Sequence, residues 1–336
     1  MFDFPLPIAV LVFVVSAAVI WVAGVKLVDA TDAIDQRFGL GQALGGAILL
    51  AIVTNLPEVA ITVSASLAGN LDVIVGNILG GIAIQTVLLA VFDLAAREKR
   101  PLSTLAGNKA NLVQANFVVM ILATCVMSTQ LDPDRSAGHL SPGPIMLLLL
   151  WLACLVLIAR TERESPRTAT TAPAPEREQG TKRPMLVFAL AAIATLVAGV
   201  ILERSGDAIA DELGMDGVLF GATFLAAATA LPELSTGLRA IARRRYAMAV
   251  SDIIGGNAFL PVLFLLAALI SGQAALPGAE PADIYLAALA MVLTAVVTIG
   301  AVLKPQNKRF GVGADSLALV GFYALGMVGL TLVATP

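Results

Sequence analysis

Charged side chains are scarce in this chain. They make up 13% of its 336 residues, whereas soluble domains contain about 25%. Hydrophobic residues make up 58%, and the mean hydropathy is +0.89. A chain this poor in charge cannot cover a water-facing surface, so the composition excludes a soluble globular protein and predicts an integral membrane protein.

Histidine, cysteine and the common catalytic motifs are also rare or missing. The chain has one histidine, His139, and two cysteines, Cys125 and Cys154, which both fall inside apolar runs. This argues against a disulfide framework and disfavours a zinc or copper site. The sequence contains no His-Glu-x-x-His zinc motif, no Gly-x-Ser-x-Gly elbow and no Walker phosphate loop. We therefore expect neither an enzyme, nor an ATP-driven pump, nor a bound cofactor.

The sequence does contain a series of apolar runs of the length that a helix needs to cross a bilayer, about 20 residues. The runs lack the alternation of a membrane β-barrel. No basic residue precedes Lys26, so we expect the first run to remain as a span rather than act as a cleaved signal peptide. We predict an all-α membrane protein with ten transmembrane helices, at about residues 6–28, 40–67, 72–94, 111–130, 143–159, 184–203, 215–242, 247–270, 282–303 and 314–334.

Part of the sequence occurs twice. Residues 22–81 align without a gap with residues 197–256, at an offset of 175 positions. Five predicted spans precede the polar stretch 160–183 and five follow it, and because five is odd the second copy enters the membrane from the opposite side. We therefore predict two inverted five-helix repeats, residues 1–159 and 184–336, joined by a flexible linker at 160–183.

The distribution of lysine and arginine predicts the orientation. Of the 21 basic residues, all but Arg135 and Arg204 fall in loops that follow odd-numbered spans. Since cytoplasmic loops carry the excess of basic residues, we expect the linker in the cytoplasm and both termini outside. The compact loops favour a prokaryotic plasma (inner) membrane. Besides the lipid bilayer, nothing in the sequence predicts a nucleic-acid partner or an obligate protein partner.

Two acids interrupt the apolar sequence at equivalent places in the two copies, Glu58 and Glu233. A carboxylate at the centre of a membrane helix costs about 2.5–3.5 kcal/mol, so an acid in that position is a candidate functional group. Each glutamate directly follows a proline, which removes a backbone donor and frees the carbonyl one turn earlier, at Thr54 or Thr229. We therefore predict that transmembrane helices 2 and 7 are broken at these points.

A second polar residue follows each glutamate after 19 positions, Asn77 in the first copy and Asp252 in the second. Equal spacing within two hairpins places all four side chains at a similar membrane depth. The two glutamates supply a charge of −2, which matches one divalent ion, and carboxylate, amide, hydroxyl and carbonyl oxygens suit Ca²⁺ better than Zn²⁺ or Cu²⁺. The predicted metal ligands are Glu58, Glu233, Asp252, Asn77, Thr54 and Thr229.

With these motifs, the two copies resemble the alpha repeats of the cation/Ca²⁺ exchanger superfamily. Its sodium/calcium exchanger members show a Thr-Ser-x-Pro-Glu-like element followed by Gly-Asn-x-x-Gly-Ser-Asn in each half. The resemblance implies a secondary antiporter that works by alternating access, with spans 1 and 6 sliding across the other helices. It also implies that Glu58 and Glu233 are the main Ca²⁺ ligands, that both threonines contribute oxygen, and that Asn77 and Asp252 complete the site.

The chain departs from the family pattern at several positions. Asn55 and Ala230 stand where a serine usually precedes the Pro-Glu pair, and Ile82 stands where the first copy usually has asparagine. Val73 and Met248 occupy positions where sodium-coupled relatives tend to place a hydroxyl. The counter-ion is therefore left open between Na⁺ and H⁺, since a proton needs only a carboxylate. A cation channel, and an exchanger for Mg²⁺, Mn²⁺ or K⁺, are the alternatives.

Overall fold

The computed structural model describes residues 5–38, 49–131, 141–164, 182–215, 217–274 and 276–334. In these ranges the chain is helical apart from its turns and one isolated β-bridge, between Arg309 and Val312. Eight helices are long and apolar enough to cross a membrane, and a bent pair adds a ninth span if it is counted as one. The predicted all-α membrane protein is confirmed, while the count of ten spans stays a prediction, because residues 39–48 of the second span lie outside the described residues.

The second half is divided into more helical segments than the first. The first half contains α1 (Leu6–Phe38), α2 (Leu49–Thr54), α3 (Leu56–Ala68), α4 (Leu71–Ala95), α5 (Leu102–Ala106), α6 (Lys109–Thr129) and α7 (Pro142–Glu164). The second half contains α8 (Lys182–Leu213), α9 (Gly217–Phe220), the π-helical turn η3 (Gly221–Leu225), α10 (Ala226–Thr229), α11 (Leu231–Ala242), α12 (Tyr246–Phe259), the 3₁₀ turn η4 (Leu260–Val262), α13 (Leu263–Ser271), α14 (Pro281–Leu303) and α15 (Ala314–Ala334).

Two helices are longer than the apolar runs predict. The runs end at residues 28 and 203, whereas α1 has 33 residues and α8 has 32. The polar segments that follow contain no proline, so the helix continues past the apolar part, and in α8 it continues through Gly206. Helix also extends into both ends of the predicted linker at 160–183, because α7 continues to Glu164 and α8 begins at Lys182.

The two helical hairpins that carry the duplicated motif close with the same backbone turn. Gly69 ends α3 in a left-handed conformation with φ of 82°, and Arg244, at the equivalent position after α11, has φ of 58°. In each turn the N–H of the next residue donates to the carbonyl oxygen five residues before it, at 2.9 and 2.8 Å. This hydrogen bond satisfies a carbonyl group at the helix end and returns the chain antiparallel as α4 or α12.

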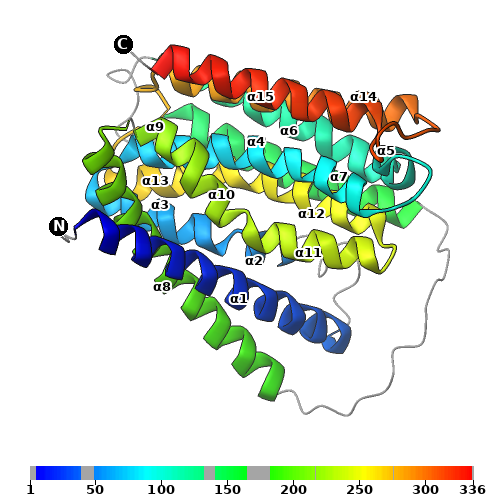
Figure 1. The fold of residues 1–336 in the computed structure, drawn as a ribbon, viewed down its shortest axis with the longest axis horizontal. Helices are drawn as coiled ribbons and strands as arrows, with labels where there is room; N and C mark the ends of the chain where they lie inside the picture. The colour runs from blue at the N-terminus through cyan, green and yellow to red at the C-terminus, as the bar shows by residue number, and fades with distance from the viewer. Residues whose placement is uncertain are drawn as a thin grey trace.

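Figure 1 shows α1 and α8 crossing each other along one side of the bundle, with α14 and α15 along the opposite side. Between them α4 and α12 form the buried centre, where the main apolar cluster includes Ile78, Leu79 and Ile253. The α1–α8 pair belongs to a second cluster, which includes Ile20, Ile61 and Leu202. The α1–α8 pair therefore packs in a cluster separate from the main one, together with residues of α3 and α4 such as Ile61 and Val73.

Two glycines bring the α1–α8 pair against the duplicated Pro-Glu motifs. A Cβ atom added to Gly24 of α1 would lie 2.9 Å from Cβ of Pro232, and one added to Gly199 of α8 would lie 3.2 Å from the carbonyl oxygen of Pro57. In both cases a glycine of one repeat packs against the proline in the Pro-Glu motif of the other repeat. Only a residue without a side chain allows so close a backbone approach.

We predict that Gly199→Val destabilises the protein by about 1–3 kcal/mol. The backbone at Gly199 packs directly against Pro57 and Ala60, so the added side chain would overlap both residues. Gly321→Val is the matched control, since nothing lies within 4 Å of that glycine on α15. Chemical denaturation of the purified protein, followed by tryptophan fluorescence, measures both. Equal stability of the two variants would contradict this packing.

Candidate cation site

The two Pro-Glu motifs stand at the first turns of two short helices. Asn55 separates α2 from α3, and Ala230 separates α10 from α11 with φ of −76° and ψ of 0°. The proline that follows each break lies in the first turn of the new helix, where its missing N–H is not needed. The glutamate comes next, at the positive end of the helix dipole. The segments Gly217–Thr229 and Leu231–Ala242 are bent by 43° at this point.

Glu58 and Glu233 are both completely buried. Among the described residues, none of their four carboxylate oxygens has a hydrogen-bond partner of normal geometry. The Glu233 carboxylate lies near enough to those of Glu58 and Asp252 to be repelled by both. A buried charged group without a partner costs more than the 1–3 kcal/mol of a neutral one, on the order of several kcal/mol, so this cluster requires a compensating ligand or protons.

Each threonine of the motif lies beside the glutamate of the other half. Thr229 is next to Glu58, and Thr54 is next to Glu233. The Thr229 hydroxyl donates to the carbonyl oxygen of Ala226 at 3.2 Å, which leaves its oxygen lone pairs available. Two hydroxyl groups and two carboxylates from both repeats therefore meet in one buried place.

The two remaining predicted ligands differ in their surroundings. Asp252 is 6% exposed and accepts a hydrogen bond of 2.8 Å from the Thr236 hydroxyl. Asn77 is completely buried on α4, next to η3, and both polar atoms of its side chain lack a hydrogen-bond partner among the described residues. The structure thus brings Asp252 to the glutamates and buries Asn77 on a neighbouring helix.

The candidate metal ligands are of several chemical types, and they do not form a close cluster of acids. Among the described residues, no three His, Cys, Asp or Glu side chains converge closely enough to hold a bare metal ion. Neither Glu58 nor Glu233 takes part in the ion pairs between described residues. Carboxylates held apart and supplemented by hydroxyl, amide and carbonyl oxygens match the oxygen ligands of a hard cation such as Ca²⁺.

The sequence analysis did not identify three features close to the motif. The first is the segment formed by α9 and η3. Gly76 of α4 approaches Val218 of α9, and Gly80 approaches Ala222 of η3, so closely that an added Cβ would overlap them. Its sequence signal is a pair of glycines spaced by four. The others are buried amides on α4 and α12: Gln85, whose only signal is a polar residue within an apolar span, and Asn257, which stands at the asparagine of the Gly-Ser-Asn element in the second copy.

Another buried acid, Asp93 at the end of α4, shows how this chain compensates a buried charge from within. Its carboxylate accepts hydrogen bonds from the N–H groups of Leu102 and Gly313, at 2.7 and 2.6 Å, and from the Ser316 hydroxyl at 2.8 Å. Lys308 Nζ lies 3.0 Å from Asp93 Oδ1 and also donates to the Asp93 carbonyl oxygen. Asp93 is therefore a structural tie between the two halves.

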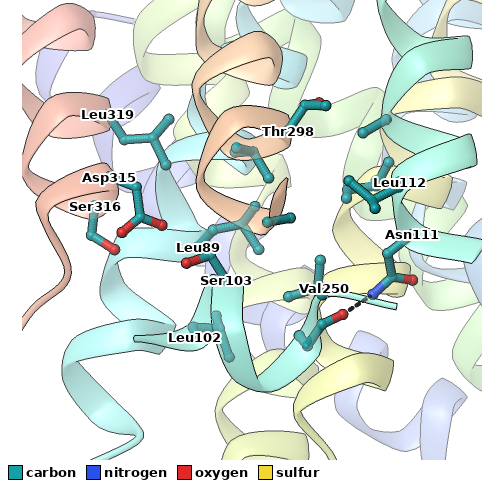
Figure 2. Close-up of a pocket in the computed structure, with 16 residues that line it drawn as sticks. Leu89, Leu102, Ser103, Asn111, Leu112, Val250, Thr298, Asp315, Ser316 and Leu319 are labelled. Carbon is teal, nitrogen blue, oxygen red and sulfur yellow. Dashed lines mark hydrogen bonds between the residues drawn. The ribbon is translucent and has the colours of Figure 1, made fainter. Parts of the chain in front are cut away.

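A small cavity lies beside this tie, away from the glutamates. Its volume is about 30 Å³, enough for one or a few water molecules. Figure 2 shows Asp315 and Ser316 of α15 on one side and Asn111 of α6 on the other. None of the six predicted ligand residues lines it. The cavity is mostly apolar and is separate from the candidate cation site.

The fold and the site together define a class, a multi-pass helical membrane protein whose two halves enclose buried acids. Comparison with known families gives the assignment: the family described as sodium/calcium exchanger protein matches residues 8–160 and 183–332. The chain belongs to this family, and it is a membrane ion antiporter by class. The two matched segments agree with the two repeats, which confirms the predicted superfamily.

Two named sequences and a solved structure are similar to this chain. Inner membrane protein YrbG of Escherichia coli (strain K12) is 29% identical over 250 residues, 73% of this chain and 75% of that protein. Putative antiporter CaxA of Alkalimonas amylolytica is 26% identical over 249 residues, 71% of this chain and 73% of that protein. A structure of the sodium-calcium exchanger NCX_Mj matches with a TM-score of 0.63 at 17% identity, covering 96% of this chain and 99% of the other. This last likeness supports the fold.

We predict that Lys308→Met destabilises the protein by about 3–5 kcal/mol, because Asp93 would remain buried without its ion pair. Lys304→Met is the control, since Lys304 is exposed. Denaturant titration of both variants gives the difference. A loss below about 1 kcal/mol, the size found for exposed pairs, would contradict a structural role for this tie.

Proposed function

We propose that this protein is a secondary antiporter that exchanges Ca²⁺, or a similar divalent cation, for Na⁺ or H⁺ by alternating access. One observation carries the proposal, the meeting of Glu58 and Glu233 from the two repeats, both buried and neither in an ion pair among the described residues. We assign these glutamates as central ligands, with oxygens from Thr54 and Thr229. Asp252 and Asn77 complete the ligand set. The cations are substrates, and the activity requires no resident cofactor and no protein partner.

Electrostatics explains why such a site exchanges ions rather than releasing one alone. Carboxylates enclosed in a low-dielectric interior are costly to keep charged, so a site emptied of cation cannot be occluded and moved across the membrane. A site that holds Ca²⁺, or the counter-ions that replace it, is compensated. Transport of one ion is therefore coupled to transport of the other, without covalent chemistry.

The α1–α8 pair is the moving part in this proposal. Ser64 of α3 donates a hydrogen bond of 2.7 Å to Glu203 of α8, and Arg239 of α11 forms an ion pair of 2.5 Å with Asp29 of α1. Ser64 and Arg239 are equivalent positions of the two repeats. Two repeat-related polar contacts thus join the pair to the central helices, and sliding of the pair would break and remake them.

The membrane topology in this proposal has ten spans in two inverted five-helix repeats, 1–159 and 184–336, with breaks in spans 2 and 7. Both termini lie outside and the linker at 160–183 lies in the cytoplasm of a prokaryotic inner membrane. The Escherichia coli relative is named as an inner membrane protein. In Figure 1 α1 begins and α15 ends at the same end of the bundle, as an even number of spans requires.

We predict that Glu58→Gln and Glu233→Gln each reduce Ca²⁺ uptake into everted membrane vesicles by at least about tenfold, or about 1.4 kcal/mol. An amide keeps the shape of the side chain but supplies no negative charge to offset the cation. Glu212→Gln, an exposed acid on α8, is the control and should transport normally. Normal uptake by both buried-site variants would remove these residues from the site.

Flux in proteoliposomes separates the antiporter from a channel and identifies the counter-ion. We expect ⁴⁵Ca²⁺ movement only when Na⁺ or H⁺ is present on the opposite side, and a gradient of the coupled ion alone should drive it. Conduction of Ca²⁺ without any counter-ion would identify a channel. Competition by Mg²⁺, Mn²⁺ or K⁺ measures which other cations the site accepts.

A further inference from the structure

A tight turn between α14 and α15 displays an exposed aromatic side chain at its tip. The N–H of Arg309 donates to the carbonyl oxygen of Val312 at 2.8 Å, and the N–H of Val312 donates to that of Arg309 at 3.1 Å. Phe310 follows Arg309, and 94% of its surface is exposed. Among the residues that the structure describes, it is the most exposed large hydrophobic one.

The backbone of this turn is poorly suited to phenylalanine. The φ angle is 54° at Phe310 and 83° at Gly311, so both central residues have positive φ, as in a type I′ turn. Such turns favour asparagine, aspartate and glycine, and a bulky residue with positive φ is an outlier. The ring of Phe310 also gains almost no packing within the chain, because it is exposed. A contact outside the chain would explain an aromatic residue here.

Asp93 holds the chain on both sides of the turn. Lys308, just before the turn, pairs with the Asp93 carboxylate, and Gly313, just after it, donates its N–H to the same carboxylate at 2.6 Å. Ser316, two residues into α15, donates its hydroxyl at 2.8 Å. Asp93, Gly313 and Ser316 are buried, so water does not compete for these contacts. The network therefore gives the exposed ring a fixed position at the end of α4.

The turn lies where two apolar spans end. Both α4, which ends at Ala95, and α14, which ends at Leu303, are candidate membrane spans. A Cβ atom added to Gly311 would lie 3.3 Å from the side chain of Leu94, which is itself exposed on the last turn of α4. In Figure 1 the connection between α14 and α15 lies at one end of the bundle, near α5. Phe310 therefore stands at the depth where the hydrocarbon gives way to the headgroups.

The loops beside the turn are basic. The loop between α4 and α5 and the loop between α14 and α15 are joined by a hydrogen bond of 2.7 Å from the Thr104 hydroxyl to the Pro305 carbonyl oxygen. The only acid in residues 96–108 and 303–314 is Glu98, which accepts a hydrogen bond of 3.0 Å from the Tyr246 hydroxyl. Five cations on these loops are exposed: Arg97, Lys99, Arg100, Lys304 and Arg309.

We propose that Phe310 and these five cations bind anionic lipid headgroups, with the ring inserted at the boundary between headgroups and acyl chains. Aromatic rings favour this boundary, and each lysine or arginine near an anionic membrane surface adds attraction. The ring sets the depth of the contact, and the cations select anionic over zwitterionic lipid. The contact lies on α4, α14 and α15, away from the α1–α8 pair, so it holds the helices that stay in place in the proposed function.

Fluorescence of a labelled cysteine measures where the ring lies. The native cysteines, Cys125 and Cys154, are buried, so a nitrobenzoxadiazole label reacts with a thiol introduced by Phe310→Cys. Gln306→Cys is the matched control, an exposed polar position on the same loop. In phosphatidylglycerol nanodiscs, we expect aqueous iodide to quench the label at 310 at least about threefold less than the label at 306. Lipid carrying a doxyl quencher should show the reverse order.

Thermal unfolding of the purified full-length protein in detergent, titrated with phosphatidylglycerol or phosphatidylcholine, measures the lipid preference. We expect phosphatidylglycerol to stabilise the wild type at lower concentration than phosphatidylcholine. Phe310→Gly suits the turn, so it should unfold no earlier than the wild type without lipid. It should nevertheless need at least about threefold more phosphatidylglycerol for half of the effect, as should Arg309→Gln, whereas Phe310→Trp should match the wild type.

Three results would each overturn the proposal. The first is equal iodide quenching at positions 310 and 306, which would place the ring in water and favour a soluble partner for the turn. The second is equal stabilisation by the two lipids. The third is a phosphatidylglycerol requirement of Phe310→Gly and Arg309→Gln that equals that of the wild type. Neither measurement involves Ca²⁺ or a counter-ion, so the outcome is independent of the transport assays that test the proposed function.

Discussion

A carboxylate enclosed within a membrane protein needs an opposite charge or hydrogen-bond donors close to it. The buried acids of this chain differ in where these compensating groups come from. Asp93 meets it inside the chain, through Lys308 and three hydrogen-bond donors. Glu58 and Glu233 lack such partners among the described residues. In the proposed function their compensation comes from the transported ions, so the cost of burying these acids is met by cation binding.

Duplication provides the geometry for this site. Each repeat contributes a short helix with a proline and a glutamate in its first turn. The contacts run between the halves, with the threonine of one beside the glutamate of the other and the glycine of one against the proline of the other. The candidate site therefore needs residues from both repeats. It can respond to a movement of the α1–α8 pair, because that pair contacts both motifs.

The sequence predicted the membrane class, the repeat, the helix positions and the acids, because each leaves a local signal in apolar length, internal identity or a charge within an apolar run. It did not predict the lengths of α1 and α8, since their ends are helical but no longer apolar. It also missed Gln85, because a single amide without a repeat equivalent carries no pattern. Whether such a side chain has a partner depends on other helices, and only the three-dimensional contacts reveal that.

The central claim is that two acids from two repeats share one cation. Anomalous X-ray scattering from crystals soaked with Sr²⁺, a heavier analogue of Ca²⁺, tests it most directly. The account predicts a peak between Glu58 and Glu233, within bonding distance of oxygens from both. A divalent ion bound elsewhere, with both glutamates remaining without a cation at saturating Sr²⁺, would contradict it.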